Sequence, residues 1–446
     1  MEGLRVALTG YRSDPRSGGQ GVYVRNLATE LGCLGHEVTV LSGPPYPDLH
    51  GTGARLVRVP SLELYEPGGP FRNRAWARVR AWPDVVEFSQ MFFGRFPEPL
   101  TFTMRVERLL APHRDRFDVV HDNQSLGSGL LDLQAAGWPV LATIHHPLTV
   151  DLALALDHID DPRWIRSTLR WYAFIEMQKR VAGTLPSILT VSEASRSDIA
   201  DQMGVPRSNL SVVPVGADPD RFRPRPHAER IPGRCFTTAS ADVPLKGLVP
   251  MLEALALLRE RQPHAHLVVL ARKPPEGPVA EAMARLALEP HVEFLSGLSD
   301  AELVAELSRS EVAVVPSLYE GFSLPAVEAM ACGVPLVATT GGALPEVVGP
   351  DGGAGLLVAP GDPAALATAI GRLLVDPALR ARVGEAGRRR VLERFTWRHC
   401  AEATVERYRD LLSRAPRTVG RCEPSGSSAT PSPTGRTARS PITTGR

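Results

Sequence analysis

The stretch from 312 to 333 reads VAVVPSLYEGFSLPAVEAMACG, and it decides the fold. Its first four residues, Val312 to Val315, form a short apolar run, which is typical of a buried parallel strand. Pro325 suits the first position of a helix, and Gly333 suits the position after its last turn. The stretch therefore predicts a strand, a loop and a short helix that begins at Leu324 or Pro325.

The same alternation of apolar runs and helical periods extends through most of the 446 residues. Strands are expected at 4–8, 37–41, 56–59, 118–121, 140–144, 188–191 and 210–213, and then at 235–239, 267–270, 292–295, 312–315, 336–338 and 355–358. Apolar residues spaced by three and four predict helices between them, as at Val24, Leu27, Leu31 and Leu34 and at Leu248, Leu252 and Leu255. This alternation indicates an α/β fold with parallel sheets.

The chain divides into two such series of strands. A segment rich in Pro and Arg, 219–232, separates them and predicts a linker. We therefore expect two doubly wound domains, 1–217 and 218–395, with ligands at the carboxyl ends of their strands. Two insertions, 62–111 and 151–184, interrupt the first domain. The segment 413–446 is dominated by Ser, Thr, Pro, Gly and Arg, which predicts a disordered tail.

Composition excludes several classes of protein. Hydrophobic residues make up 43% and charged residues 22% of the chain, which is usual for globular proteins and unlike disordered or fibrous ones. A formal net charge of +1 gives no strong field, so no nucleic-acid partner is expected. Five scattered cysteines without a C-x-x-C pair argue against a disulfide framework or a zinc site. Without a signal peptide or an apolar run near 18 residues, a cytoplasmic location is expected.

Two glutamates bracket the start of the expected helix at 324. Glu320 lies in the loop after the strand, and Glu328 lies about one turn inside the helix. The unpaired amides and positive dipole end of a helix N-terminus bind phosphate well. Carboxylates on both sides of a phosphate suit a nucleoside diphosphate sugar, which has hydroxyls on both sides of its diphosphate. The alternative, two solvated surface glutamates, is disfavoured by the spacing, the proline and the preceding strand.

A lysine follows the strand expected at 235–239, again at a carboxyl end. The chain has only three lysines, Lys179, Lys246 and Lys273, although arginine is abundant. Lys246, which Gly247 follows, therefore suggests a need for a compact ammonium group, such as contact with a diphosphate. The alternative is a chance surface lysine.

A glycine-rich loop lies between the first strand and the first helix. Gly18 and Gly19 would let backbone amides approach a ligand closely. Val24 stands where the dinucleotide-binding fingerprint needs its third glycine, so nicotinamide or flavin binding is not supported.

Histidines end two of the expected strands in the first series. His145 follows the strand at 140–144, where an imidazole can touch a sugar hydroxyl or a carbonyl that develops charge. A structural histidine with local hydrogen bonds is an equal alternative, and His146 beside it makes the choice ambiguous. His121 is expected to be structural.

Two further patterns have both a functional and a structural interpretation. Asp218-Pro219-Asp220 matches the D-x-D string that binds metal in other nucleotide-sugar enzymes, but three residues match often by chance, and we expect no catalytic metal. The segment 163–180 interleaves aromatic residues with arginines and could contact the inner face of a membrane peripherally or shape an acceptor site. A buried helix with a solvated edge is favoured, because aromatic faces usually belong to the core.

Together these motifs make the chain similar to the retaining family 4 glycosyltransferases of the GT-B type. The resemblance runs from about Arg5 to Leu412 and rests on the E-x7-E segment from Glu320 to Glu328. Supporting matches are the Gly18-Gly19 loop, Thr143-x-His145, the sequence VPVGAD at 213–218, Lys246-Gly247 and Thr340-Gly341-Gly342. The resemblance implies two Rossmann-like domains that face each other across a cleft, with a helix at 396–412 that crosses back to the first domain.

The resemblance also assigns roles to site residues. It implies three catalytic residues: Glu320 near the hydroxyls of the donor sugar, His145 beside the transferred sugar, and Lys246 on the diphosphate. The remaining donor-binding residues it implies are Gly18, Gly19, Phe322, Ser323, Leu324 and Glu328, with Glu328 on the ribose.

The chain departs from the family pattern at one cation. Family members usually carry an arginine five or six residues before the lysine, where this chain has Ala241 and Ser240. Arg272 is the candidate that would replace it. No cofactor is expected beyond the donor itself.

The leading hypothesis is transfer of a hexose from a nucleoside diphosphate sugar to an alcohol acceptor, with retention of configuration and with UDP preferred over GDP. The alternatives are a sugar-nucleotide epimerase on a similar scaffold and a non-catalytic protein that binds a nucleotide sugar. Donor incubated alone separates the first two, because only an epimerase converts it without an acceptor.

Overall fold

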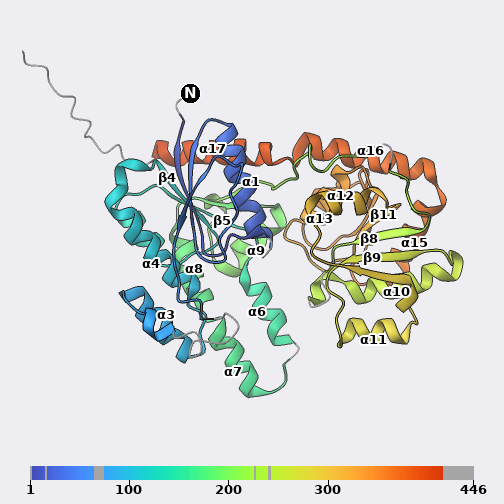
Figure 1. Cartoon of the computed structure of the whole chain (residues 1–446), viewed down its shortest axis with the longest axis horizontal. Helices are drawn as coiled ribbons and strands as arrows, with labels where there is room; N and C mark the ends of the chain where they lie inside the picture. The colour runs from blue at the N-terminus through green and yellow to red at the C-terminus, as the bar shows by residue number, and fades with distance from the viewer. Residues whose placement is uncertain are drawn as a thin grey trace, which may run out of the picture.

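Two parallel β-sheets organise the protein, one in each half of the chain (Figure 1). The computed structural model describes residues 3–15, 18–64, 75–157, 159–225, 228–239 and 243–414. Every expected strand is present, with ends that differ from the prediction by at most two residues. The α/β class and the doubly wound sheets predicted from the sequence are therefore confirmed.

The sheet of the N-terminal half has seven strands in the order β3-β2-β1-β4-β5-β6-β7. Their bounds are β1 Arg5–Gly10, β2 Glu37–Ser42, β3 Arg55–Arg58, β4 Val119–Asn123, β5 Val140–Ile144, β6 Ile188–Thr190 and β7 Leu210–Val212. The direction of winding reverses between β1 and β4, which pair in parallel with Val6 opposite Val119. A crevice at the carboxyl ends of two such strands is the usual ligand site of this fold.

The sheet of the C-terminal half has six strands in the order β10-β9-β8-β11-β12-β13. Their bounds are β8 Arg234–Thr237, β9 His266–Leu270, β10 Val292–Leu295, β11 Val312–Val315, β12 Leu336–Thr339 and β13 Leu356–Val358. Here the winding reverses between β8 and β11, where Val312 lies opposite Cys235. Lys246 follows one of these two strands and Glu320 follows the other.

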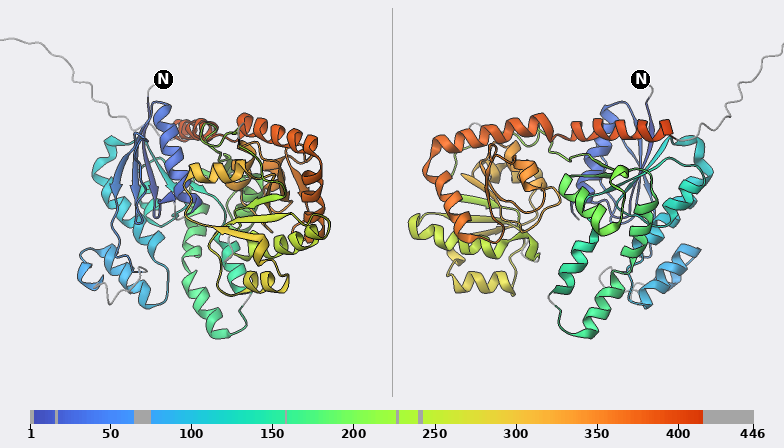
Figure 2. Two further views of the ribbon diagram at one scale, coloured as in Figure 1. Left: turned by 45° about the vertical axis from the view of Figure 1, so that its right-hand side comes forward. Right: turned by 180° about the vertical axis from the view of Figure 1, so that it is seen from behind.

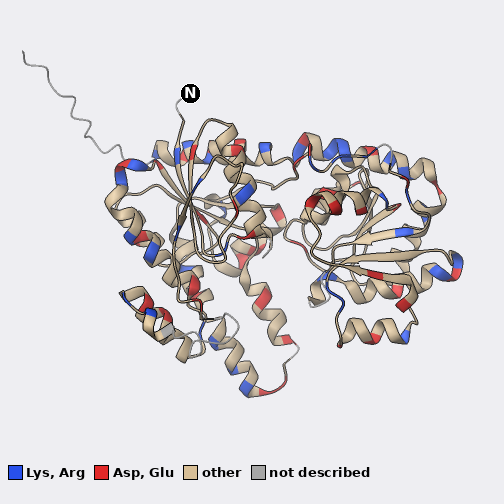
Figure 3. Cartoon of the chain, in the orientation of Figure 1, with Lys and Arg blue, Asp and Glu red and all other residues tan. Residues whose placement is uncertain are grey.

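Helices cover both faces of each sheet. In the N-terminal half they are α1 Gly19–Cys33, α3 Trp82–Phe92, α4 Glu98–Leu110, α5 Gly129–Ala135, α6 Leu148–Asp157, α7 Pro162–Trp171, α8 Phe174–Thr184 and α9 Glu193–Met203. In the C-terminal half they are α10 Leu248–Arg261, α11 Pro278–Arg285, α12 Asp300–Ser308, α13 Leu324–Ala331, α14 Leu344–Val348, α15 Pro363–Val375 and α16 Pro377–Arg394. Charged residues of both signs lie mainly on these helices, and arginines gather on α16 (Figure 3).

The last helix, α17 (Trp397–Arg414), returns to the N-terminal half and packs on α1. Figure 2 shows α16 and α17 following each other along one side of the molecule. Tyr408 of α17 hydrogen-bonds through its hydroxyl to Nδ1 of His121 at 2.7 Å, inside the core of the first half. The predicted crossover helix is confirmed, and it continues two residues beyond its expected end at 412. The tail predicted beyond it lies outside the described residues from 415 onward.

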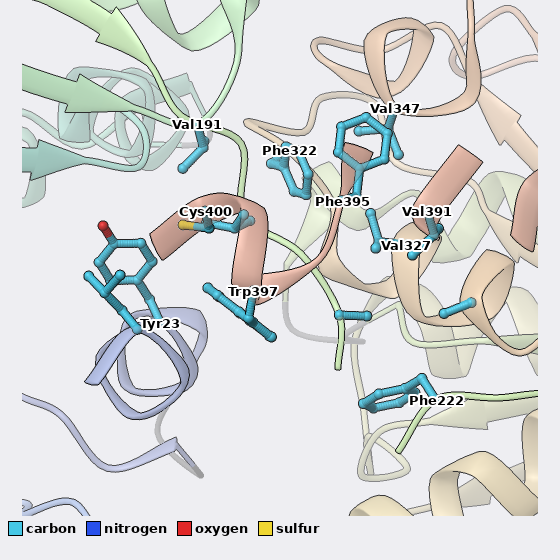
Figure 4. Close-up of a cluster of buried hydrophobic side chains, with 14 of the residues drawn as sticks. Tyr23, Val191, Phe222, Phe322, Val327, Val347, Val391, Phe395, Trp397 and Cys400 are labelled. Carbon is cyan, nitrogen blue, oxygen red and sulfur yellow. The ribbon is translucent and has the colours of Figure 1, made fainter. Parts of the chain in front are cut away.

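One hydrophobic cluster joins the two halves. Trp397 and Cys400 of α17 lie between Tyr23 of α1 and the Phe322–Phe395 pair, whose rings meet edge to face at 5.6 Å (Figure 4). These side chains are almost completely buried. Because burial of each large apolar side chain contributes about 1.5–3 kcal/mol, this cluster stabilises the contact of the two halves beside the crossing segments.

The chain passes between the halves at two places that touch each other. Ala217, before β8, donates its N–H to the carbonyl of Phe395 at 2.9 Å, and Trp397 donates its N–H back to Ala217 at 3.4 Å. Gly216 fits because a Cβ there would lie 2.4 Å from the Phe395 carbonyl oxygen. The two crossing segments therefore form one short bridge. The domain boundaries at 217/218 and 395/396 stay a prediction.

The second insertion differs from its expected structure. Helices α6 and α7 project away from both sheets (Figure 1), and none of the residues in α7 is buried. Trp164 is 66% exposed. The favoured interpretation of 163–180 as a buried helix is wrong for α7, because no sheet lies over its aromatic face. Peripheral membrane contact through this segment stays a prediction; in the described part of the chain, no helix is long and apolar enough to span a bilayer.

Candidate active site

The N-terminus of α13 offers three unpaired backbone amides. The helix begins at Leu324, as predicted, and the Ser323 hydroxyl caps it by accepting the N–H of Ala326 at 3.4 Å. The N–H groups of Phe322, Ser323 and Leu324 donate to no other described residue. Ser323 holds a φ of +92°, a strained value for a residue with a side chain. Such a set of amides at a helix start binds an anion.

Glu320 and Lys246 meet beside this helix start. The Nζ of Lys246 donates to Oε1 of Glu320 at 2.9 Å, and the hydroxyl of Ser317 donates to the same oxygen at 2.7 Å. Glu320 is only 8% exposed, whereas the lysine side chain is 34% exposed. Oε2 of Glu320 has no hydrogen-bond partner among the described residues. The pair therefore holds a fixed carboxylate oxygen that can accept a hydroxyl and a cation that can meet an anion.

Close backbone contacts hold the loops of this pair. Gly247 has a φ of +66°, and a Cβ there would lie 2.0 Å from the carbonyl oxygen of Pro316. Gly342 has a φ of +60°, and its Cβ would lie 2.2 Å from the carbonyl oxygen of Glu320. Only glycine fits either position. Lys246-Gly247 and Thr340-Gly341-Gly342 are thus sequence signals of loops packed on the segment 316–320.

Glu328 lies one turn inside α13 and is partly buried. The pKa of its carboxyl is raised to about 8, mainly by burial and also by Asp300, while Arg221 opposes the rise. Its carboxyl makes no hydrogen bond or ion pair with another described residue. A carboxyl group desolvated without a partner is typical of a binding site, which suits the ribose contact expected for Glu328.

The pKa of Glu328 gives a stability prediction. Between its usual value of 4.5 and about 8, the folded chain keeps a proton that the unfolded chain loses, so this group lowers the unfolding free energy as pH rises through that window. The variant Glu328→Gln lacks this effect. We expect its Tm to rise relative to wild type by about 3 °C between pH 5 and pH 8. The exposed Glu385→Gln serves as control, and a Tm difference that does not change with pH would contradict the prediction.

The glycine-rich loop lies at the start of α1, which begins at Gly19. A Cβ at Gly18 or at Gly19 would meet no atom within 4 Å. Packing within the protein therefore does not require glycine at 19, and contact with a ligand explains the small residue better.

The open space at Gly19 predicts separate effects on binding and stability. In Gly19→Val we expect the affinity for a nucleoside diphosphate to fall at least tenfold, because the branched side chain occupies the approach to the loop. The unfolding free energy should change by less than about 1 kcal/mol. Gly183→Val, at an equally open glycine of α8, is the matched control. Unchanged affinity would exclude this loop from the site.

His145 follows β5 with a fixed ring. Its Nε2 lies 2.8 Å from Oδ1 of Asn123, and Tyr23 packs on it edge to face at 4.8 Å. Burial lowers the pKa of His145 to about 3, so the ring is neutral at physiological pH. His121 is structural, as predicted: it is buried between the hydroxyls of Tyr408 and Thr143.

The two halves meet where these loops end. The hydroxyl of Ser195 on α9 lies 3.1 Å from the carbonyl oxygens of both His145 and Gly321. Ser192 donates to the Gly321 carbonyl at 2.6 Å. The structure therefore brings the loop of His145 and the loop of Glu320 side by side, although 175 residues separate them in the sequence.

Two side chains extend this contact. Glu346 of α14 accepts the N–H groups of Glu193 and Ala194, at the start of α9, at 2.8 Å each. The hydroxyl of Tyr319 donates to Asp198. The sequence analysis did not find Glu346 or Tyr319, nor Ser192 of the preceding contact. Ser192 could have been found as a helix cap after β6, but nothing in the sequence singles out Glu346, whose role depends on the other half.

The structure also places two other features that the sequence singled out: Arg272, the candidate second cation, and the D-x-D string at 218–220. Arg272 is exposed two residues beyond the end of β9, the strand that neighbours β8. Ser240 and Ala241 lie outside the described residues.

Asp218, the first residue of the D-x-D string, accepts the N–H groups of Asp220 and Arg221 at 3.0 and 3.2 Å, so it stabilises a turn. No group of three metal-ligating side chains occurs in the described ranges.

A cavity of about 1060 Å³ lies elsewhere, at the amino-terminal ends of β1, β4 and β5. Arg5, Asp118 and Arg414 are among its lining residues. None of the predicted site residues reaches it. The candidate site therefore remains the one at the carboxyl ends of the strands, where the predicted side chains gather.

Comparison with known proteins identifies the class. The sequence model described as "Glycosyltransferase Family 4" matches residues 17–221, and the one described as "Glycosyl transferases group 1" matches residues 227–390. The fold is similar to the solved structure of sucrose-phosphate synthase (tll1590) from Thermosynechococcus elongatus, with a TM-score of 0.70 and 24% identity over 92% of this chain and 99% of that one. The architecture is that of the GT-B glycosyltransferases.

Curated relatives narrow the assignment. The chain is 49% identical to the MMP alpha-(1->4)-mannosyltransferase of Mycolicibacterium hassiacum over 92% of this chain and 99% of that protein. It is 34% identical to the GDP-mannose-dependent alpha-(1-6)-phosphatidylinositol monomannoside mannosyltransferase of Mycolicibacterium smegmatis, over 77% of this chain and 88% of that protein. The chain belongs to glycosyltransferase family 4 and is a retaining glycosyltransferase. The expected preference for UDP over GDP finds no support in these relatives.

Proposed function

We propose that the protein transfers mannose from GDP-mannose to a hydroxyl group of a sugar acceptor, with retention of configuration. The observation that carries the proposal is the joint placement of Lys246, Glu320 and the three unpaired amides of α13 against the loop of His145. The choice of GDP-mannose follows the two mannosyltransferase relatives, one of which is named as GDP-mannose-dependent. An α-(1→4) linkage is the one named for the Mycolicibacterium hassiacum relative.

Each group then has a role that its chemistry supports. Lys246 and the amides of Phe322, Ser323 and Leu324 stabilise the diphosphate as charge develops on it. Glu320 accepts hydroxyls of the donor sugar through its unpaired Oε2. Arg272 is the proposed second cation.

The other donor contacts come from both halves. Glu328 accepts the ribose hydroxyls, and because this contact favours the ionised carboxylate, donor binding should release a proton. Gly18 and Gly19 let the N-terminal half approach the diphosphate.

The acceptor hydroxyl attacks from the face that the diphosphate leaves, and an oxygen of the leaving diphosphate takes its proton. The protein contributes position and charge, and we identify no nucleophile–base pair among the described residues of the site.

Two measurements test the proposal. GDP, UDP and ADP are compared by thermal shift at one equal concentration, and we expect GDP to raise Tm most. A nucleotide present at a hundred times its dissociation constant stabilises the folded chain by about 2.7 kcal/mol. GDP-mannose with and without a mannose oligosaccharide should give GDP and an elongated product only with the oligosaccharide. Conversion of the donor alone to another sugar nucleotide would favour the epimerase, and indifference to all three nucleotides would overturn the assignment.

A further inference from the structure

Asn123, the last residue of β4, connects two parts of the proposed donor site. Its Nδ2 lies 3.3 Å from the backbone oxygen of Gln20, next to the glycine-rich loop, and its Oδ1 lies 2.8 Å from Nε2 of His145. A carbonyl oxygen can only accept, so the amide NH2 must face Gln20 and the amide oxygen must face His145. Nε2 of His145 is therefore the nitrogen that carries hydrogen.

The other ring nitrogen follows from this assignment. The ring is neutral because burial and the neighbouring His146 lower the pKa of His145. A neutral imidazole with hydrogen on Nε2 has a bare lone pair on Nδ1. Nδ1 makes no hydrogen bond to any other described residue. His145 can thus accept a hydrogen bond from a hydroxyl but cannot donate one through Nδ1.

Gln124 fixes the backbone that carries this ring. It is 2% exposed, and its Oε1 accepts the N–H of His145 at 2.8 Å while its Nε2 donates to the carbonyl of His146 at 2.9 Å. Its φ is +56°, an uncommon conformation for a residue other than glycine. Strain of this kind persists where the surroundings hold a residue in place, often at functional sites. Asp122 holds the turn by accepting the N–H groups of Ser125 and Leu126 at 2.8 and 2.9 Å.

We propose that Asn123 and Gln124 are positioning residues for transfer: Asn123 fixes the tautomer of His145 and Gln124 fixes its place, so that Nδ1 accepts a hydrogen bond from a substrate hydroxyl. The role of these residues in transfer rests on the proposed function. The tautomer of His145 does not, because it follows from the hydrogen bonds of Asn123. With this tautomer, His145 favours a sugar that has a hydroxyl group, able to donate a hydrogen bond, at the position facing Nδ1. A sugar with hydrogen or fluorine there would lose the contact.

The first test measures the tautomer without any turnover. Long-range ¹H–¹⁵N spectra of the uniformly ¹⁵N-labelled full chain, with the His145→Ala spectrum for assignment, should show His145 neutral with hydrogen on Nε2 at pH 7. In Asn123→Leu the ring should populate both tautomers. Hydrogen on Nδ1 in the wild-type protein would overturn the inference, whatever donor the enzyme uses.

The second test separates positioning from a purely structural role. We expect Asn123→Leu to lower kcat with GDP-mannose 10- to 100-fold while the Kd for GDP changes less than threefold. In the His145→Ala background the same substitution should lower kcat by less than threefold further. Full additivity of the two losses would overturn the role of Asn123, because it would show that Asn123 does not act through His145.

Asn123→Asp supplies a pH readout. A carboxylate beside Nε2 favours the imidazolium. The other titratable groups around the ring are Tyr23 from α1, His121 from β4, and the His146–Asp151 pair beside it. The kcat of this variant should fall as pH decreases from 7 to 5.5, relative to wild type at each pH. An unchanged profile would contradict the inference.

Gln124 is tested with two variants that differ in strain. Gln124→Gly removes the side-chain clamp but accommodates the positive φ, and Gln124→Leu removes the clamp and keeps the strain. Both should lower kcat at least tenfold, and Gln124→Gly should retain the wild-type Tm more closely. Wild-type kcat in a folded Gln124→Gly would exclude the clamp from the reaction. Absence of transfer by the wild-type protein, with the expected tautomer present, would instead count against the proposed function.

Discussion

The variant Lys246→Ala should lose about a thousandfold in kcat/KM. A charge-assisted hydrogen bond contributes about 1.5–3 kcal/mol, which is a 10- to 100-fold loss in donor affinity. A further loss in kcat is expected because the ammonium faces the diphosphate as negative charge builds on it, and a single such donor is worth about 100-fold or more. Steady-state kinetics with GDP-mannose and titration with GDP measure the two parts separately.

Controls distinguish this loss from damage to the fold. Removal of the ammonium leaves the carboxylate of Glu320, 8% exposed, with Ser317 as its one hydrogen-bond partner among the described residues, so Lys246→Ala should also lower Tm. The double variant Lys246→Ala/Glu320→Gln should recover that stability without recovering activity. Lys179→Ala, at a surface lysine paired with Glu176, should change neither. Near-wild-type kcat/KM in Lys246→Ala would remove the cation from the proposed mechanism.

The variant Glu320→Gln should lower kcat about 100- to 1000-fold while the affinity for GDP changes less than threefold. The amide keeps the size of the side chain and a hydrogen bond to Ser317, but it has no negative charge to stabilise the positive charge that develops on the sugar ring. GDP lacks the sugar, so its binding should not detect the change. This separation of kcat from nucleotide affinity distinguishes a sugar contact from a diphosphate contact.

An exposed glutamate provides the comparison. Glu193→Gln, which keeps the backbone N–H that Glu346 accepts, should leave kcat within twofold of wild type. If Glu320→Gln weakened GDP binding as strongly as it lowered kcat, the carboxylate would be supporting Lys246 on the diphosphate and not the sugar. Full activity in Glu320→Gln would favour a non-catalytic role for the site.

Local sequence signals predicted the fold and placed Lys246 and Glu320 at the carboxyl ends of neighbouring strands. The strand at Val312–Val315 and the helix at Leu324 were predictable because apolar runs, a proline and a helix cap act within a few residues. Lys246 and Glu320 were predictable as neighbours because both follow strands at a reversal of winding. Their direct ion pair was not predicted, because strand order places the two loops side by side without fixing which side-chain atoms meet.

The contacts between the halves were not predictable in the same way. Ser195, Glu346 and Asn123 act on backbone groups that are distant in the sequence, and an ordinary serine, glutamate or asparagine has no pattern that marks such a role. The exposure of α7 was also missed, because an aromatic helix has the same periodicity whether or not another layer covers it. In each case the deciding interaction is tertiary, whereas the available signal is local.

The short bridge of Ala217 with Phe395 and Trp397 limits how the enzyme can move. The two linkers run side by side and hydrogen-bond to each other. We expect them to act as a single pivot, which allows the two halves to rotate but resists their sliding or separation. In a rotation about this pivot, the displacement of each residue grows with its distance from the bridge. The bridge would then move little, while contacts between the halves that lie far from it would separate. Substrate entry and product exit would therefore use a one-dimensional motion, whose amplitude a pair of fluorophores placed on α9 and α14 could follow during turnover.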